Sequence, residues 1–149
     1  MKKIKLTQGR YAIVDDEDYK YLNKYKWCFG SNDYAMRVVD KETILMHRVI
    51  NKTPESMITD HINHDKLDNR KNNLRTCTKA QNRINAKMNK NNNSGYKGVT
   101  WNKLGRKWRA YIRINGKSKH LGYFDNKEEA NKAYNIISKK YFGEFSFIE

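Results

Sequence analysis

DHINHDKLDNRKNNLRTCTKAQNRINA, the stretch from Asp60 to Ala86, decides the fold of the segment that carries the chemistry. An aspartate and a histidine open it, an asparagine-rich turn follows, and Leu74–Cys77 has the composition of a short strand. From Thr78 onward the apolar residues recur every four positions, which predicts a helix with one apolar stripe. These residues are Ala80, Ile84 and Met88. With Ile58 to Asp60 extended, the expected order is strand, turn, strand, helix.

Three polar side chains in this stretch suit metal-assisted cleavage of a phosphodiester. Asp60 offers a carboxylate and Asn82 an amide oxygen, and Mg²⁺ takes oxygen ligands while keeping several waters. His61 can accept a proton from water, because a neutral imidazole titrates near pH 6.5. Neighbouring side chains on a strand point to opposite faces, so we expect the backbone to bend between Asp60 and His61.

The chain is strongly basic, with 31 Lys and Arg against 16 Asp and Glu, a net charge of +15. Such a charge favours a polyanionic partner, with nucleic acid ahead of an anionic membrane surface. The excess is largest in residues 94–149, where 12 basic and 5 acidic side chains give +7. From Lys97 to Lys119 there are eight Lys or Arg and no acid.

Other features of the composition favour an intracellular, cytoplasmic protein with no membrane partner. No apolar run approaches the length of a membrane span, and the N-terminus lacks the apolar centre of a signal peptide. Cys28 and Cys77 are the only cysteines, and two free thiols suit a reducing compartment. The low apolar content predicts two or three small cores.

Residues 1–50 are predicted to be rich in β-strands. Short apolar runs alternate with turn signals and predict strands in RYAIV, KWCFG, YAMRVV and TILMHRVI. The segment from Asp18 to Tyr25 is either a short helix or an irregular turn. His47 lies in the last predicted strand, where packing, DNA contact and chemistry all remain open.

A change in composition at residues 90–95, KNNNSG, predicts a linker between domains at 1–89 and 96–149. Beyond it, GVTWN, KWRAYIRI and KSKHLGYF predict three strands, and Asn115-Gly116 is a hairpin signal. Asp125 with Glu128 forms a capping box that starts a helix. The predicted fold class is α+β, with a three-stranded antiparallel sheet and one packed helix in the second domain.

The middle strand of this sheet is expected to have two different faces. Trp108, Ala110 and Ile112 would face the helix, while Lys107, Arg109, Tyr111 and Arg113 would face away from it. A cationic face with an aromatic side chain suits a groove of duplex DNA. A solvated basic face is the alternative.

The Asp60 segment resembles the HNH (ββα-metal) nuclease motif, in the variant with asparagine in place of the last metal-binding histidine. The resemblance rests on Asp60-His61, Asn72-Asn73-Leu74 and Gln81-Asn82. It implies that Asp60 and Asn82 hold one divalent metal per active site, Mg²⁺ or Mn²⁺. It also implies that His61 is the general base and that Asn73 ties the hairpin together.

The longer stretch HRVINKTPESMITDHINHDKLDNRKNNLR resembles phage and intron-borne HNH homing endonucleases, in which a histidine like His47 precedes the motif. This resemblance implies a ββα-metal nuclease module at about residues 56–88. It also implies a homing-type endonuclease that acts on duplex DNA in the host cell of a phage or mobile element. We expect no small-molecule cofactor and a monomer on DNA.

Residues 95–149 resemble the DNA-binding domain of plant ethylene-response factors, the apetala-type fold. The matching marks include Tyr96-Lys97-Gly98-Val99, Lys107-Trp108 and Leu121-Gly122-Tyr123-Phe124. That family lays its sheet in the major groove. The implied DNA contacts are Lys97, Thr100, Asn102, Arg109, Tyr111, Arg113, Ser118 and His120. Several of these positions are arginine or tryptophan in the plant domains, so the plant target sequence is not implied.

Three alternatives remain open from the sequence. The chain could be a non-catalytic, sequence-specific DNA-binding regulator with a vestigial nuclease motif, or a general nucleic-acid-binding or RNA-processing protein. A zinc site could also form from four side chains, although the cysteines lack the paired spacing that zinc sites usually show. The four are His61, His64, Cys28 and Cys77.

Overall fold

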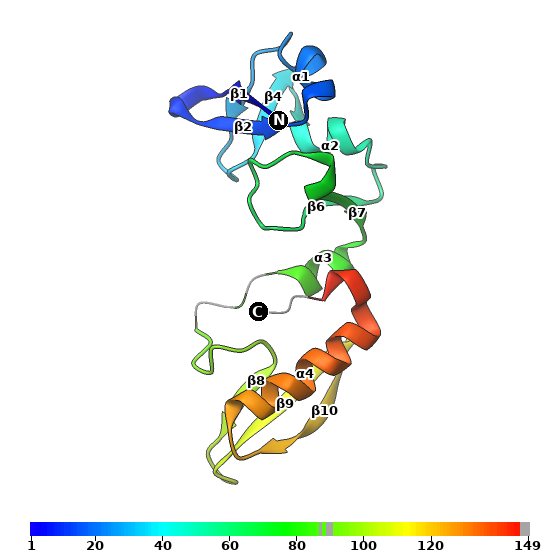
Figure 1. Ribbon diagram of the computed structural model, residues 1–149. Helices are drawn as coiled ribbons and strands as arrows, with labels where there is room; N and C mark the ends of the chain where they lie inside the picture. Colours follow the sequence, from blue (N-terminus) through cyan, green and yellow to red (C-terminus); the bar gives the residue numbers. More distant parts are fainter. Residues whose placement is uncertain (87, 89–90, 147–149) are drawn as a thin grey trace. The chain divides into compact units, whose positions relative to one another are not determined.

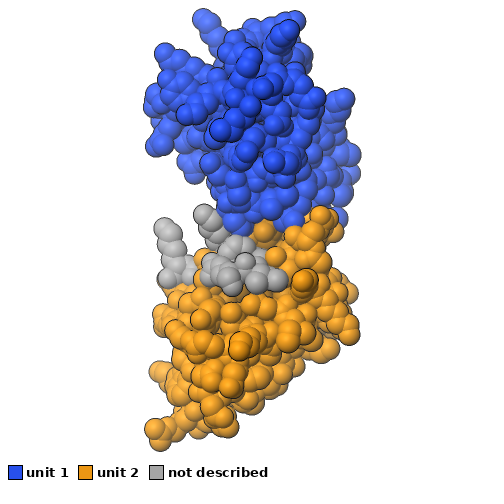
Figure 2. All heavy atoms as spheres, in the orientation of Figure 1, with its two compact units in different colours: residues 1–80 blue, residues 81–149 orange. Residues whose placement is uncertain are grey.

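The computed structural model describes residues 1–86, 88 and 91–146, and the chain divides into two compact units, residues 1–80 and 81–149 (Figures 1 and 2). Each unit has its own hydrophobic core, as the low apolar content predicted. The mixture of helices and sheets confirms the α+β class. Among the described residues, no helix combines the length and apolarity needed to cross a membrane.

Unit 1 consists of three small antiparallel sheets with short helices between them. The first pair is β1 (Lys2–Lys5) and β2 (Tyr11–Val14), followed by α1 (Asp16–Leu22). The second sheet has the order β3 (Cys28–Phe29), β4 (Ala35–Val39), β5 (Glu42–Leu45), and α2 (Met46–Asn51) follows it. The third is the hairpin of β6 (Ile58–His61) and β7 (Leu74–Cys77). Short 3-10 turns lie at Thr7–Gly9 and Lys71–Asn73.

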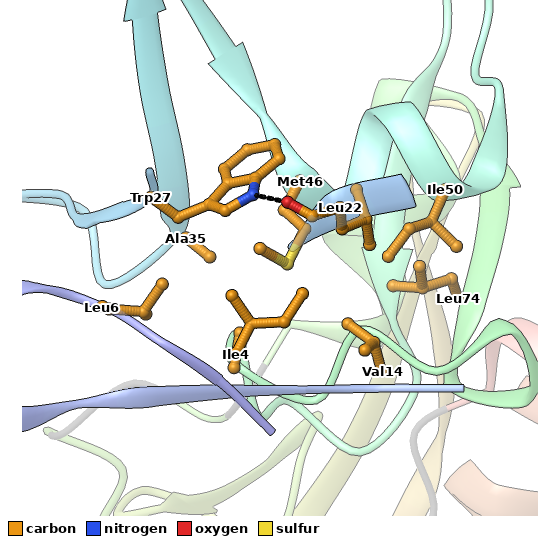
Figure 3. Close-up of a cluster of buried hydrophobic side chains, with 10 residues drawn as sticks. Ile4, Leu6, Val14, Leu22, Trp27, Ala35, Met46, Ile50 and Leu74 are labelled. Atoms are coloured by element: carbon orange, nitrogen blue, oxygen red, sulfur yellow. Dashed lines mark hydrogen bonds between the residues drawn. The ribbon is translucent and has the colours of Figure 1, made fainter. Parts of the chain in front are cut away.

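The core of unit 1 gathers side chains from the first sheet, both helices, β4 and β7 (Figure 3). The indole Nε1 of Trp27 donates to the carbonyl oxygen of Leu22 at 2.8 Å, so the one polar atom of this buried ring is satisfied. The core residues are Ile4, Leu6, Ala12, Val14, Leu22, Trp27, Ala35, Met46, Ile50 and Leu74. Since Leu74 belongs to this core, the β6–β7 hairpin is anchored to unit 1.

The prediction of a strand through TILMHRVI was wrong in its second half, because helix α2 begins at Met46. Met46 and Ile50 are four residues apart and both buried, which is the spacing of one helical face. A single helical turn and a short strand give similar apolar patterns, so periodicity could not separate them. His47 therefore lies on a helix. The segment from Asp18 to Tyr25, for which a helix or an irregular turn was expected, is helical as far as Leu22 in α1.

The hairpin that carries the Asp-His pair was predicted correctly. Asp60 lies opposite Arg75 and His61 opposite Leu74 in a regular antiparallel register. No break in strand pairing separates Asp60 from His61, because the ladder continues through His61 and the turn follows it. The backbone amide of Ile62 donates to the backbone carbonyl of Asn73 at 2.9 Å, where the turn begins.

Helix α3 (Lys79–Asn85) is shorter than predicted and lies at the division between the units. The prediction extended it to Met88, which lies outside the helix. At the end of α3 the amine of Lys97 donates to the carbonyls of Ile84 and Ala86, the latter at 2.8 Å. These bonds satisfy carbonyl groups that the end of a helix leaves unpaired.

Unit 2 contains the three predicted strands, β8 (Val99–Asn102), β9 (Lys107–Ile114) and β10 (Lys117–Phe124), in the order β10-β9-β8. Helix α4 (Lys127–Phe142) follows, ends at Gly143 and leads into a 3-10 turn at Gly143–Phe145. Val99, Ala110 and Ala130 form the core between sheet and helix. The predicted faces of β9 are confirmed, since Ala110 and Ile112 are buried and Arg109 and Arg113 are exposed.

The predicted capping box at the start of α4 was wrong by one residue. Asn126 is the N-cap, and its side-chain oxygen accepts from the amide of Glu129 at 2.8 Å. Asp125 instead pairs with Lys107 at 3.1 Å. Both residues are good caps, so the sequence alone favoured neither position clearly.

Candidate active site and nucleic-acid interface

The Asp60 carboxylate is fixed on the β6–β7 hairpin by Arg75. The two residues lie opposite each other in the ladder, so their side chains emerge on the same face. Arg75 donates to Oδ2 of Asp60 from Nε at 2.9 Å and from Nη2 at 2.8 Å. Both side chains are at most 10% exposed. The pair holds one carboxylate oxygen of Asp60 in place on the hairpin.

The His61 imidazole is oriented by Asn69, a fully buried residue of the loop between the two strands. The Oδ1 atom of Asn69 lies 3.2 Å from Nε2 of His61. The Nδ2 atom of Asn69 donates to the carbonyl of Leu67 at 3.2 Å, so Oδ1 is the atom that faces the histidine. Nε2 of His61 is then the donor, and the lone pair of the neutral ring lies on Nδ1.

Burial lowers the pKa of His61 below its ordinary value of 6.5, and this effect exceeds the opposing ones of the Asn69 hydrogen bond and the Asp60 charge. The imidazole is therefore neutral at physiological pH, which is the form that accepts a proton. A fixed, neutral imidazole next in sequence to a buried carboxylate can serve as a general base.

Asn73 closes the loop between the strands. Its Oδ1 accepts from the amide of Asn63 at 3.0 Å, and its Nδ2 donates to the Asn63 side chain at 2.9 Å and to the Asp68 carbonyl at 2.8 Å. Arg70 in turn donates to the Asp68 carboxylate from two nitrogens. This hydrogen bonding is the largest of the effects that lower the pKa of Asp68. Asn73 thus fixes the loop that carries Asn69.

His47 packs against His61 from helix α2. It is only 5% exposed, which leaves little surface for contact with DNA. The ring centroids of His47 and His61 are 5.1 Å apart, and Tyr34 lies 4.7 Å from His47. Burial, with a smaller effect from His61, lowers the pKa of His47 to about 3. His47 is therefore a neutral ring at physiological pH.

The predicted site residues fall into two groups. The structure places Asp60, His61 and Asn73 on one hairpin, with His47 packed against it. Asn82 lies on α3 in unit 2 and is half-buried. No cluster of three or more His, Cys, Asp or Glu side chains suited to a metal occurs among the described residues, so the zinc alternative finds no support there.

Most of the predicted DNA contacts share one face of the unit 2 sheet. Thr100 pairs with Arg109, Asn102 with Lys107, Ser118 with Arg113, and His120 with Tyr111. Directly paired residues share a face, and so do alternate residues along β9. The pairing thus gathers seven of the eight candidates: Thr100, Asn102, Arg109, Tyr111, Arg113, Ser118 and His120. Lys97 differs, because its amine binds carbonyls at the end of α3.

A groove of about 920 Å³ lies beside β8 within unit 2. Its described lining includes the cations Arg83 and Lys103 and the rings of Trp101 and Tyr111, and it contains no carboxylate side chain. Cations with exposed aromatic rings are the combination by which proteins hold nucleic acid backbones and bases. The groove therefore extends the basic surface of the sheet.

Comparison with known proteins identifies the family. The HNH endonuclease family matches residues 45–84, which contain α2 and the β6–β7 hairpin. An uncharacterised HNH endonuclease of Acanthamoeba polyphaga mimivirus is 30% identical over 145 residues, which cover 93% of this chain and 74% of that protein. The chain belongs to the HNH endonuclease family.

A second viral protein is also similar to the chain. Protein 3.8 of Escherichia phage T7 is 36% identical to this HNH endonuclease over 64 residues, covering 43% of the chain and 53% of that protein. No solved structure matches the chain significantly.

HNH nucleases generally use a divalent metal, and the donor chemistry at Asp60 fits one. Hard divalent cations bind carboxylate oxygens and tolerate few protein ligands when waters and phosphate complete the shell. A buried carboxylate with one oxygen already fixed by Arg75 meets that requirement with little loss of side-chain freedom.

Three residues that contact Asp60 or His61 were not predicted from the sequence: Tyr34, Asn69 and Arg75. Arg75 could have been found, because pairing β6 with β7 in register places it opposite Asp60. Asn69 could not be singled out, because the turn contains several asparagines with no pattern that distinguishes one from another. Tyr34 precedes β4, and no local pattern connects it with a histidine 27 positions later.

The buried ring of His47 predicts that stability falls in acid. Below pH 6.5 the unfolded chain protonates His47, whereas the folded chain resists protonation until about pH 3. The folded state then binds one proton fewer, so the free energy of unfolding drops by about 1.4 kcal/mol per pH unit across this window. Urea unfolding at a series of pH values between 4 and 8 gives the free energy of unfolding as a function of pH. This free energy should fall less steeply toward acid in His47→Phe than in the wild type. The same pH dependence in both proteins would contradict the prediction.

Proposed function

We propose that this HNH endonuclease hydrolyses phosphodiester bonds in duplex DNA, with His61 as the general base and one divalent metal, Mg²⁺ or Mn²⁺, on Asp60 and Asn82. The observation that carries the proposal is the buried His61 imidazole, oriented by Asn69 and next in sequence to the buried Asp60 carboxylate. His61 takes the proton from the attacking water at Nδ1, and Asn69 keeps the ring in the required tautomer. A metal bound there would stabilise charge on the phosphate and on the leaving 3′ oxygen.

The sheet of unit 2 is proposed to dock the enzyme on duplex DNA. Its face of Arg109, Arg113 and their paired residues supports this, as does the charge of +7 in residues 94–149. The proposal includes a homing-type enzyme of a phage or mobile element that acts as a monomer on DNA, and the viral source of the relatives fits action in a host cell. The resemblance to the ethylene-response-factor domain remains part of this proposal.

Plasmid cleavage tests the proposed activity. Supercoiled DNA incubated with the full chain and Mg²⁺ is expected to become nicked or linear, and EDTA should abolish the reaction. A chain that retards DNA in a gel but never cleaves it with Mg²⁺ or Mn²⁺ would instead be the non-catalytic regulator. Tighter binding of duplex RNA than of duplex DNA would favour the RNA-processing alternative.

Removing two cations from the sheet is expected to weaken DNA binding. Arg109→Ala with Arg113→Ala should lower affinity and reduce the slope of log K against log salt by about 2, because each lost phosphate contact removes about one released counterion. Fluorescence anisotropy across a salt series measures both quantities. Lys139→Ala with Lys140→Ala removes the same charge from exposed positions on α4 and should change affinity less. Equal losses for the two pairs would contradict a specific docking face.

A further inference from the structure

We propose that Tyr34 and His47 are positioning residues that hold the His61 imidazole at its working angle. The inference rests on the proposed role of His61 as general base. It concerns three rings from three separate elements: the turn before β4, helix α2 and the end of β6.

The three rings form a closed triangle. His47 meets His61 edge to face, with centroids 5.1 Å apart and planes at 79°. The ring centroid of Tyr34 lies 5.8 Å from that of His61, and the two ring planes are inclined at 32°. The centroids of Tyr34 and His47 are 4.7 Å apart, with their planes at 55°. Edge-to-face and tilted contacts at these distances are favourable beyond simple burial.

The triangle supplies a restraint that the hydrogen bond to Asn69 lacks. A bond at Nε2 fixes one corner of the imidazole, about which the ring can still pivot. Such a pivot would swing Nδ1, on the other side of the ring, away from an attacking water. Ring contacts from Tyr34 and His47 block this motion. Misplacing a catalytic group by 1 Å can cost about 100-fold in rate.

Tyr34 is itself held in place from the loop that carries Asn69. The Lys66 amine lies 4.9 Å from the centroid of the Tyr34 ring and donates to the Asn32 carbonyl at 2.9 Å. Lys66 also lies 3.7 Å from the Asp33 carboxylate. These contacts connect the turn before β4 with the loop of the nuclease hairpin. Burial, with the charges of Asp60 and Asp33, raises the pKa of Tyr34, so its phenol stays neutral.

Kinetics with saturating DNA and metal test the proposal. Tyr34→Ala and His47→Ala are expected to lower kcat by about 10- to 100-fold with little change in KM, because DNA binding is untouched. Tyr34→Phe and His47→Phe keep a ring and should stay within about threefold of the wild type. Tyr21→Ala removes an exposed tyrosine of α1 as the matched control and should leave kcat unchanged. If Tyr34→Ala retains full kcat, or Tyr34→Phe loses as much as Tyr34→Ala, the proposal is overturned.

Proton NMR of His61 gives a second readout that needs no cleavage. Tyr34→Ala should move the ring protons of His61 as the ring current is lost, and should broaden them as the ring gains freedom. Unchanged shifts and widths would overturn the positioning role even if kcat fell. A wild type that never cleaves DNA would refute the proposed function, while the NMR comparison would still decide the positioning role. Should Tyr34→Ala fail to fold, Tyr34→Leu fills similar volume without a ring and replaces it in both measurements.

Discussion

Replacing His61 with alanine is expected to lower the rate of DNA cleavage by about 10²- to 10⁴-fold, the range that general acid–base catalysis contributes. The loss should appear in kcat, because the buried imidazole has little surface to contribute to DNA binding. Single-turnover cleavage of a labelled duplex with Mg²⁺ measures it directly. Gel shifts on the same samples should show unchanged affinity.

His64→Asn provides the matched control for the histidine. His64 lies three residues further along, in the turn after β6, with a φ of 62°. Asparagine tolerates this left-handed conformation, so the turn should survive. We expect its cleavage rate to stay close to that of the wild type. If His61→Ala cleaves as fast as His64→Asn, His61 is not the general base.

Asp60→Asn is expected to lower cleavage by at least about 100-fold, because a metal supplies several kcal/mol of transition-state stabilisation. Asparagine keeps an oxygen for Arg75 but loses the charge that attracts the cation. Alanine would be a poorer choice, since it removes the acceptor oxygen as well as the charge, and breaking a buried ion pair costs about 3–5 kcal/mol. Calorimetric titration with Mn²⁺ measures metal binding apart from cleavage.

Asp65→Asn is the control for this change. Asp65 is an exposed carboxylate in the same loop, and its Oδ1 accepts from the amide of Leu67 at 3.0 Å, a bond that asparagine can keep. Its Mn²⁺ affinity and cleavage rate should match the wild type. Asn82→Ala in the same titration tests the second ligand, and an unchanged Kd for Mn²⁺ would remove Asn82 from the site.

The local features of the fold followed from the sequence. Leu74–Cys77 and the three strands of unit 2 were predicted within a residue or two, because alternation and turn residues such as Asn115-Gly116 determine hairpins locally. Helix α2 was missed because six residues give too few repeats of the apolar pattern, and its burial comes from contacts with distant strands.

The support of the candidate site could not be predicted in the same way. The sequence pattern singled out Asp60 and His61, the residues proposed to carry the chemistry. Their supports depend on pairing between positions far apart, such as Arg75 across the hairpin and Tyr34 in front of β4. Nor did the pattern indicate that Lys97, a candidate DNA contact, would bind the end of α3.

The bond from Lys97 to the carbonyls of Ile84 and Ala86 joins the end of α3 to the first residues of the sheet domain. Helix α3 also carries Asn82, the proposed metal ligand. The second domain, which is proposed to dock on DNA, therefore cannot be exchanged without an effect on α3. A chimera joined at residue 95 would replace Lys97, whose amine bonds the carbonyls at the end of this helix. A substitution at position 97 would therefore affect the helix that carries Asn82, whatever it does to DNA recognition.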